Sequence, residues 1–179
     1  MEGRVISVNA NPEYGFSKPR LDEVTLIEGF GVEGDVHAGA TVKHRYLVRT
    51  KPEAPNLRQV HLIHGELLDH VATLGHVVAP GELGENITTE GIDLLGLPRG
   101  TRLRFGDAAE VELTVLRNPC GQIDAFQPGL KDHLQPLDAD GVRTRLSGVM
   151  SVVTAGGVIR PGDRITVILP PEPHEALTT

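Results

Sequence analysis

The stretch Glu110-Val111-Glu112-Leu113-Thr114-Val115 alternates polar and apolar side chains. Successive side chains of a β-strand point to opposite faces, so this period of two predicts a strand over residues 110–116 with one wet face and one face in a core. Six other short apolar runs, separated by turn residues, also predict strands. They cover residues 5–8, 24–27, 59–63, 101–105, 149–154 and 164–169.

The composition also favours a β-rich fold. The 179 residues include 21 glycines and 13 prolines, which implies many turns and few long helices, and the absence of tryptophan leaves an aliphatic core. One helix is predicted over residues 65–74, where apolar side chains recur at helical spacing and Gly75 follows. Short helical turns are expected after Cys120 and Gly129.

The spacing of the strands predicts a closed or strongly curled sheet, an all-β-dominated fold with a few short helices, rather than alternating βα units. A chain of this length is expected to form one domain. We assign this domain to residues 1–169, with an exposed loop over 48–57 and a flexible polar tail over 170–179. Short exposed strands leave a homodimer open.

The charge of the chain argues against two classes of partner. The formal net charge is −7 and no dense run of Lys or Arg occurs. Proteins that bind duplex nucleic acid or anionic membranes usually present a basic face. No apolar run approaches the ~18 residues of a membrane span, and the polar N-terminus does not read as a signal peptide. With a single cysteine, a reducing cytoplasm is the expected compartment.

The one cysteine, Cys120, follows the predicted strand in the stretch Arg117-Asn118-Pro119-Cys120-Gly121. Proline restricts the backbone before the sulfur and glycine frees it afterwards, so we expect the thiol at an exposed strand-to-turn corner. A helical turn that starts there would direct backbone N–H groups at the sulfur and favour the thiolate. Free cysteines are also among the most buried residues, so the residues alone leave core packing and chemistry open.

Two loops rich in glycine and polar residues could supply the neighbours of this thiol. In residues 31–39, three glycines let the backbone hold Asp35 and His37 toward a cavity. In residues 80–88, glycines alternate with acidic and amide side chains, and Asn86 can both donate and accept hydrogen bonds. Ordinary surface turns would also explain both loops.

The histidines around residue 65 invite a zinc-hydrolase interpretation that their spacing does not support. His61, His64 and His70 contain no His-Glu-x-x-His pair, and His61 falls on a predicted strand while His70 falls on a predicted helix. We therefore expect ordinary exposed or capping histidines. No nucleophile elbow, P-loop or dinucleotide fingerprint occurs either.

Taken in order, six segments of the chain resemble the MOSC domain, named for the C-terminal domain of molybdenum cofactor sulfurases. The resemblance covers nearly the whole chain, and it implies a β-barrel-like domain with a cavity that holds the cysteine of the family, here Cys120. The segments are Lys18-Pro19, Gly34-Asp35-Val36-His37-Ala38-Gly39, Arg58-Gln59-Val60, Pro80-Gly81-Glu82-Leu83-Gly84-Glu85-Asn86, Asn118-Pro119-Cys120 and Gly156-Gly157-Val158-Ile159-Arg160-Pro161-Gly162-Asp163.

The resemblance also implies a role for Cys120. In the amidoxime-reducing relatives the matching cysteine binds the molybdenum of a pterin cofactor, and related bacterial domains reduce N-hydroxylated bases and similar N–O compounds. We therefore expect a molybdenum-dependent reductase of N-hydroxylated small molecules, with Cys120 as the metal ligand. In the sulfurases the domain is thought to help pass sulfur to the cofactor, so the alternative is a sulfur-carrier or cofactor-delivery module that holds a persulfide on Cys120.

The phosphate of the pterin cofactor needs hydrogen-bond donors and local positive charge. Arginine suits bidentate phosphate contacts best, and lysine supplies a point charge. The residues that we expect to meet this need are Lys18, Arg58, Arg117 and Arg145.

The other loop residues would complete the site. Asn86 is a further cofactor-binding candidate, while Asp35 and His37 are the catalytic candidates beside Cys120. His37 would be either the proton donor for cleavage of the N–O bond or a structural hydrogen-bonder. One cysteine cannot hold an iron–sulfur cluster, so we expect an external electron-donor reductase as partner, or a cysteine desulfurase if the chain carries sulfur.

Overall fold

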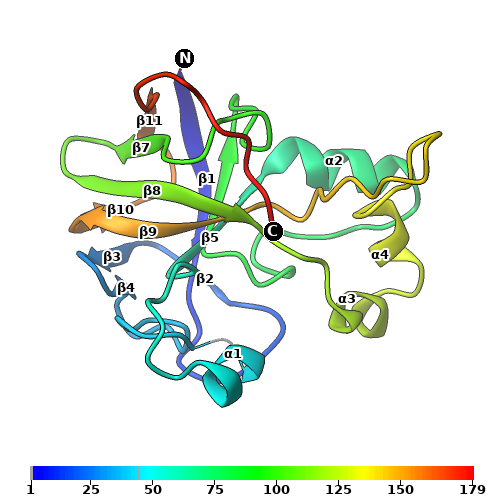
Figure 1. Ribbon diagram of the computed structural model, residues 1–179, viewed down its shortest axis with the longest axis horizontal. Helices are drawn as coiled ribbons and strands as arrows, with labels where there is room; N and C mark the ends of the chain where they lie inside the picture. The colour runs from blue at the N-terminus through cyan, green and yellow to red at the C-terminus, as the bar shows by residue number, and fades with distance from the viewer. Residues whose placement is uncertain (1, 44) are drawn as a thin grey trace.

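A seven-stranded barrel forms the body of the molecule in the computed structural model, which describes residues 2–43 and 45–179. Strand β11 pairs with β1 and thereby closes the ring (Figure 1). All neighbouring strands of the ring are antiparallel except β5 and β6, which are parallel. The closed sheet predicted from the spacing of the strands is thus confirmed. Around the barrel the order is β1 (Glu2–Asn9), β6 (Ile87–Glu90), β5 (Val60–His64), β9 (Val149–Ala155), β8 (Ala109–Leu116), β7 (Arg102–Phe105) and β11 (Arg164–Ile168).

Smaller strands extend this barrel. Strand β2 (Arg20–Leu21) pairs with the end of β1, and a three-stranded sheet consists of β10 (Gly157–Ile159), β3 (Val24–Ile27) and β4 (Gly31–Val32). The helix α2 (Gly65–Thr73) connects the two parallel strands β5 and β6. Parallel neighbours need such a crossover, because a tight turn reverses the chain.

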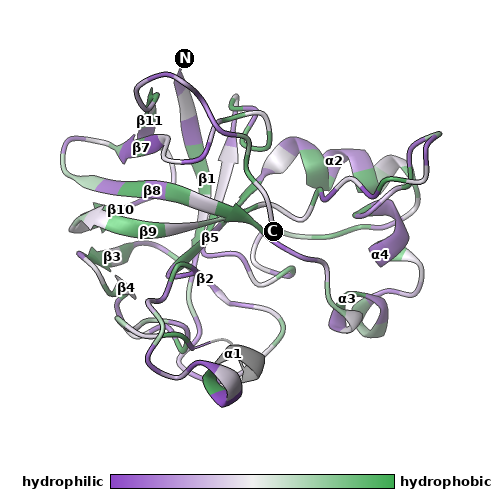
Figure 2. Ribbon diagram, in the orientation of Figure 1, coloured by the Kyte–Doolittle hydropathy of each residue, from purple (hydrophilic) through white to green (hydrophobic). Residues whose placement is uncertain are grey.

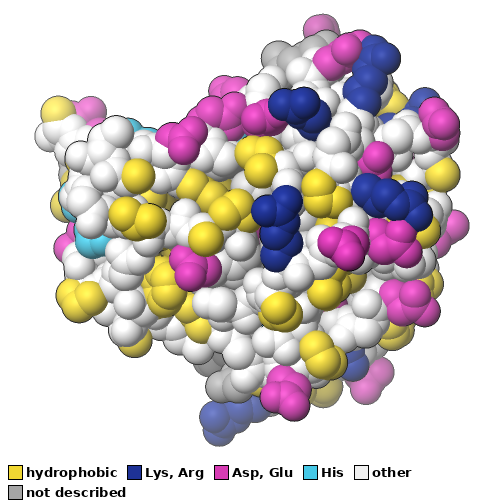
Figure 3. All heavy atoms as spheres, turned by 180° about the vertical axis from the view of Figure 1, so that it is seen from behind, with side chains coloured by type: hydrophobic (Ala, Val, Ile, Leu, Met, Phe, Trp, Pro, Cys, Tyr) yellow, Lys and Arg dark blue, Asp and Glu magenta, His cyan; other side chains and the backbone are white. Residues whose placement is uncertain are grey.

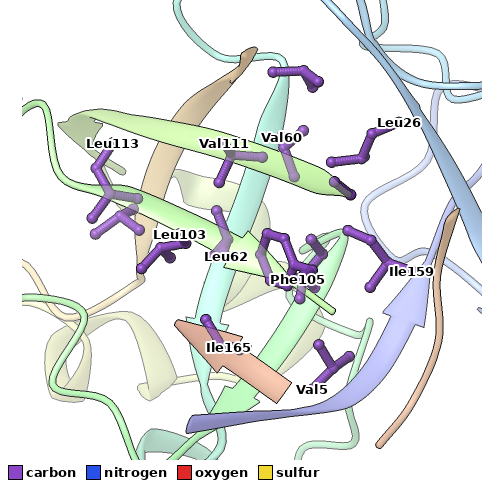
Figure 4. Close-up of a cluster of buried hydrophobic side chains, with 14 of the residues drawn as sticks. Val5, Leu26, Val60, Leu62, Leu103, Phe105, Val111, Leu113, Ile159 and Ile165 are labelled. Atoms are coloured by element: carbon purple, nitrogen blue, oxygen red, sulfur yellow. The ribbon is translucent and has the colours of Figure 1, made fainter. Parts of the chain in front are cut away.

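The barrel interior is aliphatic, as the composition predicts. Leu62, Leu103, Phe105, Val111 and Leu113 are all at most 1% exposed and belong to one cluster, which Figure 4 shows between the strands. In Figure 2 green, apolar stretches run along β8 and β9 between paler and purple ones. Burial of these side chains is the main source of stability for the barrel.

Strand β8 departs from the simple alternation of its sequence. Its register against β9 shifts twice, between Glu110 and Val111 and again between Leu113 and Val115. Thr114, predicted on a wet face, is buried and donates from Oγ1 to the carbonyl of Leu57 at 2.6 Å. Each irregularity changes which side chains face inward, so the predicted wet face is partly covered.

A second apolar cluster joins the helices to the barrel. Helices α3 (Gly121–Phe126) and α4 (Leu130–His133) confirm the two short helical turns that we predicted after Cys120 and Gly129. Ile123 and Leu130 from these helices pack with Leu67 and Val71 of α2. This lobe projects from the side of the barrel in Figure 1 and fixes the position of α3.

Three sequence predictions differ from the structure at their ends. The loop predicted over 48–57 begins within helix α1 (Arg45–Thr50), and the loop predicted over 80–88 runs into β6. The tail does not lie free at residues 175–178, because Ala176 pairs with Pro98 and the Leu116 amide donates to the carbonyl of Thr178 at 2.8 Å. Leu177 is only 7% exposed, so burial of one apolar side chain holds this segment on the barrel.

The surface carries no broad basic face in the view of Figure 3, where Lys and Arg side chains lie among Asp and Glu. Within residues 2–43 and 45–179, no helix has the length and the unbroken apolar run that a membrane crossing requires.

Candidate functional site

A cavity of about 470 Å³ lies where the loops of the barrel meet the segment that leads from β8 to α3. This volume is within the usual range of small-molecule sites. We predicted eight site residues, and six of them line this cavity. These six come from five separate parts of the chain. They are Lys18, His37, Arg58, Asn86, Arg117 and Cys120.

The thiol of Cys120 is presented at the predicted corner. Strand β8 ends at Leu116, and the Arg117 amide donates to the carbonyl of Gly148 at 3.0 Å, which holds the chain as it leaves the sheet. Cys120 has an extended backbone and directly precedes α3. Its half-buried Sγ lies 3.8 Å from Oε1 of Gln122 and borders the cavity. The sulfur is therefore available to a ligand rather than packed in the core.

A buried ion pair supports part of the cavity wall. Nζ of Lys18 lies 2.8 Å from Oδ2 of Asp35, and both side chains are almost fully buried. Burial opposes the charge on Asp35, but the His37 side chain and the Lys18 ammonium together hold the pKa of this carboxyl well below its usual value. Burial lowers the pKa of Lys18, against the opposing charge of Asp35. Asp35 itself does not line the cavity, and it contacts both Lys18 and His37, which do.

Asn86 connects the same wall to the barrel. Its Nδ2 donates to the carbonyl of Asn9 and to Oδ2 of Asp35, both at 3.1 Å, and its Oδ1 accepts from the backbone amide of His61 at 3.2 Å. Both donors of the amide are therefore occupied within the protein. Asn86, which lines the cavity, therefore keeps only acceptor capacity for a ligand.

His61 is, with Lys43, one of the cavity residues that the sequence interpretation missed. We expected an exposed or capping histidine, but His61 is 4% exposed and borders the cavity. Its Nε2 lies 2.8 Å from the carbonyl of Ser147, and a carbonyl only accepts, so Nε2 carries the proton. Burial and the nearby charge of Arg117 lower the pKa of His61 well below its ordinary value. The apolar pattern of strand 59–63 was the one signal that could have predicted this burial.

Cations dominate the charge of the cavity wall. Lys43, Arg58 and Arg117 line it together with Lys18, and no Asp or Glu belongs to the lining among the described residues. Of these four, Lys18 alone has an acidic partner at ion-pair distance within the described part of the chain. Burial lowers the pKa of both Arg58 and Arg117, and the charges of Cys120 and Glu85 oppose that shift at Arg117.

Arg117 has an unsatisfied donor. Its side chain as a whole is half-buried, but its Nη1 atom is inaccessible to solvent and has no hydrogen-bond partner within the described residues. Glu85, which is fully buried behind the cavity, also has one carboxylate oxygen without a partner there. Unpaired buried polar atoms of this kind are costly unless a ligand or water satisfies them.

Arg145 lies outside the cavity lining, as Asp35 does, whereas His37 lines the cavity near its opening. Arg145 does not line the cavity; its Nε donates to Oδ1 of Asn118 at 2.5 Å and so holds the rim from outside. The ring of His37 is about one-third exposed, and its Nδ1 lies 3.4 Å from Oδ1 of Asp35. His37 is thus the more exposed of the two histidines that line the cavity.

The donor set fits a metal that arrives with its own organic ligand. In the portion of the chain that the structure describes, no three His, Cys, Asp or Glu side chains gather closely enough to hold a metal ion by themselves. A single soft sulfur beside a cation-lined cavity suits a thiophilic metal carried by an anionic cofactor. The unsatisfied Nη1 of Arg117 and the unpaired Arg58 and Lys43 are appropriate donors for a phosphate.

Comparisons with known proteins agree with this geometry. The MOSC domain model matches residues 33–166, whereas no curated protein sequence matches the chain. The YUAD protein from Bacillus subtilis superimposes with a TM-score of 0.75 at 24% identity, covering 93% of this chain and 96% of that one.

Two further solved structures are similar in fold. YiiM from Geobacillus stearothermophilus has a TM-score of 0.69 at 18% identity, and the match covers 98% of this chain and 80% of that one. YiiM from Escherichia coli has a TM-score of 0.65 at 20% identity, covering 98% and 73% respectively. At such identities these likenesses concern the fold alone.

Proposed function

Because the chain belongs to the MOSC domain family, which is associated with the molybdenum cofactor, we propose that its cavity holds a molybdenum–pterin cofactor and that the protein reduces N-hydroxylated compounds. One observation supports this most strongly: the only thiol of the chain borders a cavity that four cations line. The overall reaction would convert an N–OH group, two electrons and two protons into N–H and water. An external reductase would supply the electrons.

Different residues of the cavity would bind the metal and the phosphate of the cofactor. Cys120 would offer its thiolate to the metal, and Arg58, Arg117 and Lys43 would neutralise the phosphate of the pterin. Bound molybdenum supplies two-electron redox chemistry suited to removing oxygen from nitrogen. The Lys18–Asp35 pair and Asn86 would keep the wall rigid, so that ligand groups meet donors that are already in place.

His37 is the residue that we propose as the proton donor. Asp35 accepts a hydrogen bond from the backbone amide of His37 at 2.9 Å and also lies near its Nδ1, which orients the ring. This arrangement leaves Nε2 to exchange a proton with a ligand in the cavity. His61 would not act as the proton donor, because its Nε2–H donates to the Ser147 carbonyl and burial disfavours its charged form.

The test is metal and pterin analysis of protein produced in a host that makes the cofactor. We expect about one molybdenum and one pterin per chain in the wild type, loss of molybdenum in Cys120→Ser, and reduction of a hydroxylamine or amidoxime only by the wild type. Arg99→Gln, which removes an exposed charge that does not line the cavity, is the matched control. Equal molybdenum in wild type and Cys120→Ser would refute the role of the thiol.

A sulfur-carrying module is the second candidate function, because the half-buried thiol next to unpaired cations would also stabilise a persulfide anion. Incubation with a cysteine desulfurase followed by intact-mass measurement tests it. A single added sulfur in the wild type, none in Cys120→Ser, and no reduction of N-hydroxylated substrates by cofactor-loaded protein would favour this function over the reductase.

A further inference from the structure

The cavity is lined by one thiol and by several cationic side chains, and this holds for the protein without any cofactor. Cys120 shares the wall with Lys43, Arg58 and Arg117, none of which has an acidic partner at ion-pair distance among the described residues. The chain as a whole carries a formal charge of −7. A local excess of positive charge in an acidic protein attracts small anions to one place.

A second observation points to an anionic ligand near the sulfur. Nη1 of Arg117 is wholly buried without a partner in the described structure, three residues before Cys120. Arg117 and Cys120 line the same cavity, as the two ends of one continuous segment that also contributes Asn118 and Pro119. An anion bound at Arg117 would therefore lie close to the thiol.

We propose that Cys120 is a site of reversible mixed-disulfide formation with small disulfides that carry carboxylate groups. The Cys120 thiolate attacks one sulfur of the reagent, a new Cys120–sulfur bond forms, and the reagent's own S–S bond breaks. The second half leaves as a thiolate, and the proton of Cys120 passes to solvent. Cys120 is oxidised and the disulfide reagent is reduced, so the electrons balance. Arg58, Arg117 and Lys43 select the reagent by pairing with its carboxylates.

This modification goes beyond the proposed function, since it concerns the thiol in protein whose cavity holds no other ligand. It occupies the sulfur that a metal would need. A thiol reductant restores the free thiol, because the same exchange runs in reverse. The chain would thus carry a removable protecting group on its one cysteine.

The experiment compares three alkyl disulfides that differ in charge: 3,3′-dithiodipropionate, bis(2-hydroxyethyl) disulfide and cystamine. Intact mass gives the rate at which each adds one half-reagent to the full chain, and every rate is divided by that of a free cysteine derivative. We expect the dianion to react fastest and the dication slowest. The preference should shrink at high salt, because salt screens the cations.

Single-charge variants locate the selectivity. Arg58→Gln and Lys43→Gln should each lower the dianion-to-dication rate ratio by about threefold or more, as for unit charges on the order of 6 Å apart in water. Arg99→Gln should leave the ratio unchanged, and Cys120→Ser should gain no mass. A wild-type charge preference equal to that of the free cysteine derivative, or one that salt and both variants leave intact, would overturn the proposal. The salt series needs no variant and so tests it even if a variant misfolds.

Discussion

Replacing His61 with glutamine removes a histidine that burial keeps neutral in the folded protein. An unfolded histidine takes up its proton near pH 6.5, whereas the lowered pKa of His61 keeps the folded protein from doing so. The unfolded chain therefore binds more protons below that pH, and the free energy of unfolding falls by about 1.4 kcal/mol for each pH unit. Between pH 7 and pH 5, with His61 neutral in the folded protein, this one residue lowers the stability by about 2 kcal/mol.

Glutamine is the informative substitution, because its amide can still donate to the Ser147 carbonyl but cannot take up a proton. Urea unfolding at a series of pH values measures the loss of stability on acidification in both proteins. We expect the loss between pH 7 and pH 5 to be smaller by about 2 kcal/mol in His61→Gln. The difference between the two proteins is the quantity to use, since Glu85 contributes equally to both.

The contribution of Glu85 has the opposite sign. Burial raises the pKa of Glu85, so its folded form keeps a proton that the unfolded chain loses as the pH rises above its ordinary pKa. This stabilises the protein at low pH and partly masks the effect of His61 in the wild type. His70→Gln, at an exposed position, is the matched control. An identical pH dependence in wild type and His61→Gln would refute the view that His61 is neutral in the folded state.

Three substitutions test the packing around the site by chemical denaturation. Lys18→Met leaves the buried Asp35 without its cation and should lower the free energy of unfolding by about 3–5 kcal/mol. Asn86→Asp replaces a donor with a second carboxylate next to Asp35 and should cost about 3 kcal/mol, more at pH 7 than at pH 4, where the new carboxyl is largely protonated. Leu177→Ala removes the apolar anchor of the C-terminal segment and should cost about 2 kcal/mol.

Matched exposed positions provide the controls for these changes. Lys51→Met and Leu169→Ala alter side chains of the same types at exposed positions, so each should change the stability by no more than about 0.5 kcal/mol. A loss at Lys18→Met no larger than at Lys51→Met would contradict the importance of the buried pair. Equal losses at Leu177→Ala and Leu169→Ala would show that the terminal segment lies free after all.

The strands of the barrel could be predicted because their signals are local. All seven predicted runs are strands, and the run over residues 24–27 matches β3 at both ends. The strands that the sequence analysis missed are the short β2, β4 and β10 and the threonine-containing β6, which have little or no apolar alternation of their own. Their pairing with longer neighbours decides their conformation, and a period of two cannot reveal it.

By itself the sequence determined that the chain curls into a β-rich domain and that Cys120 follows a strand at a corner, since alternation, proline and glycine act over a few residues. Only the tertiary structure decided which side chains share the cavity. The fold brings residues 18, 58 and 117 to one cavity, buries His61 and leaves Arg145 outside the cavity lining. The physical reason is that the pKa of a group and its access to a ligand depend on neighbours distant in sequence, which only the folded chain brings together.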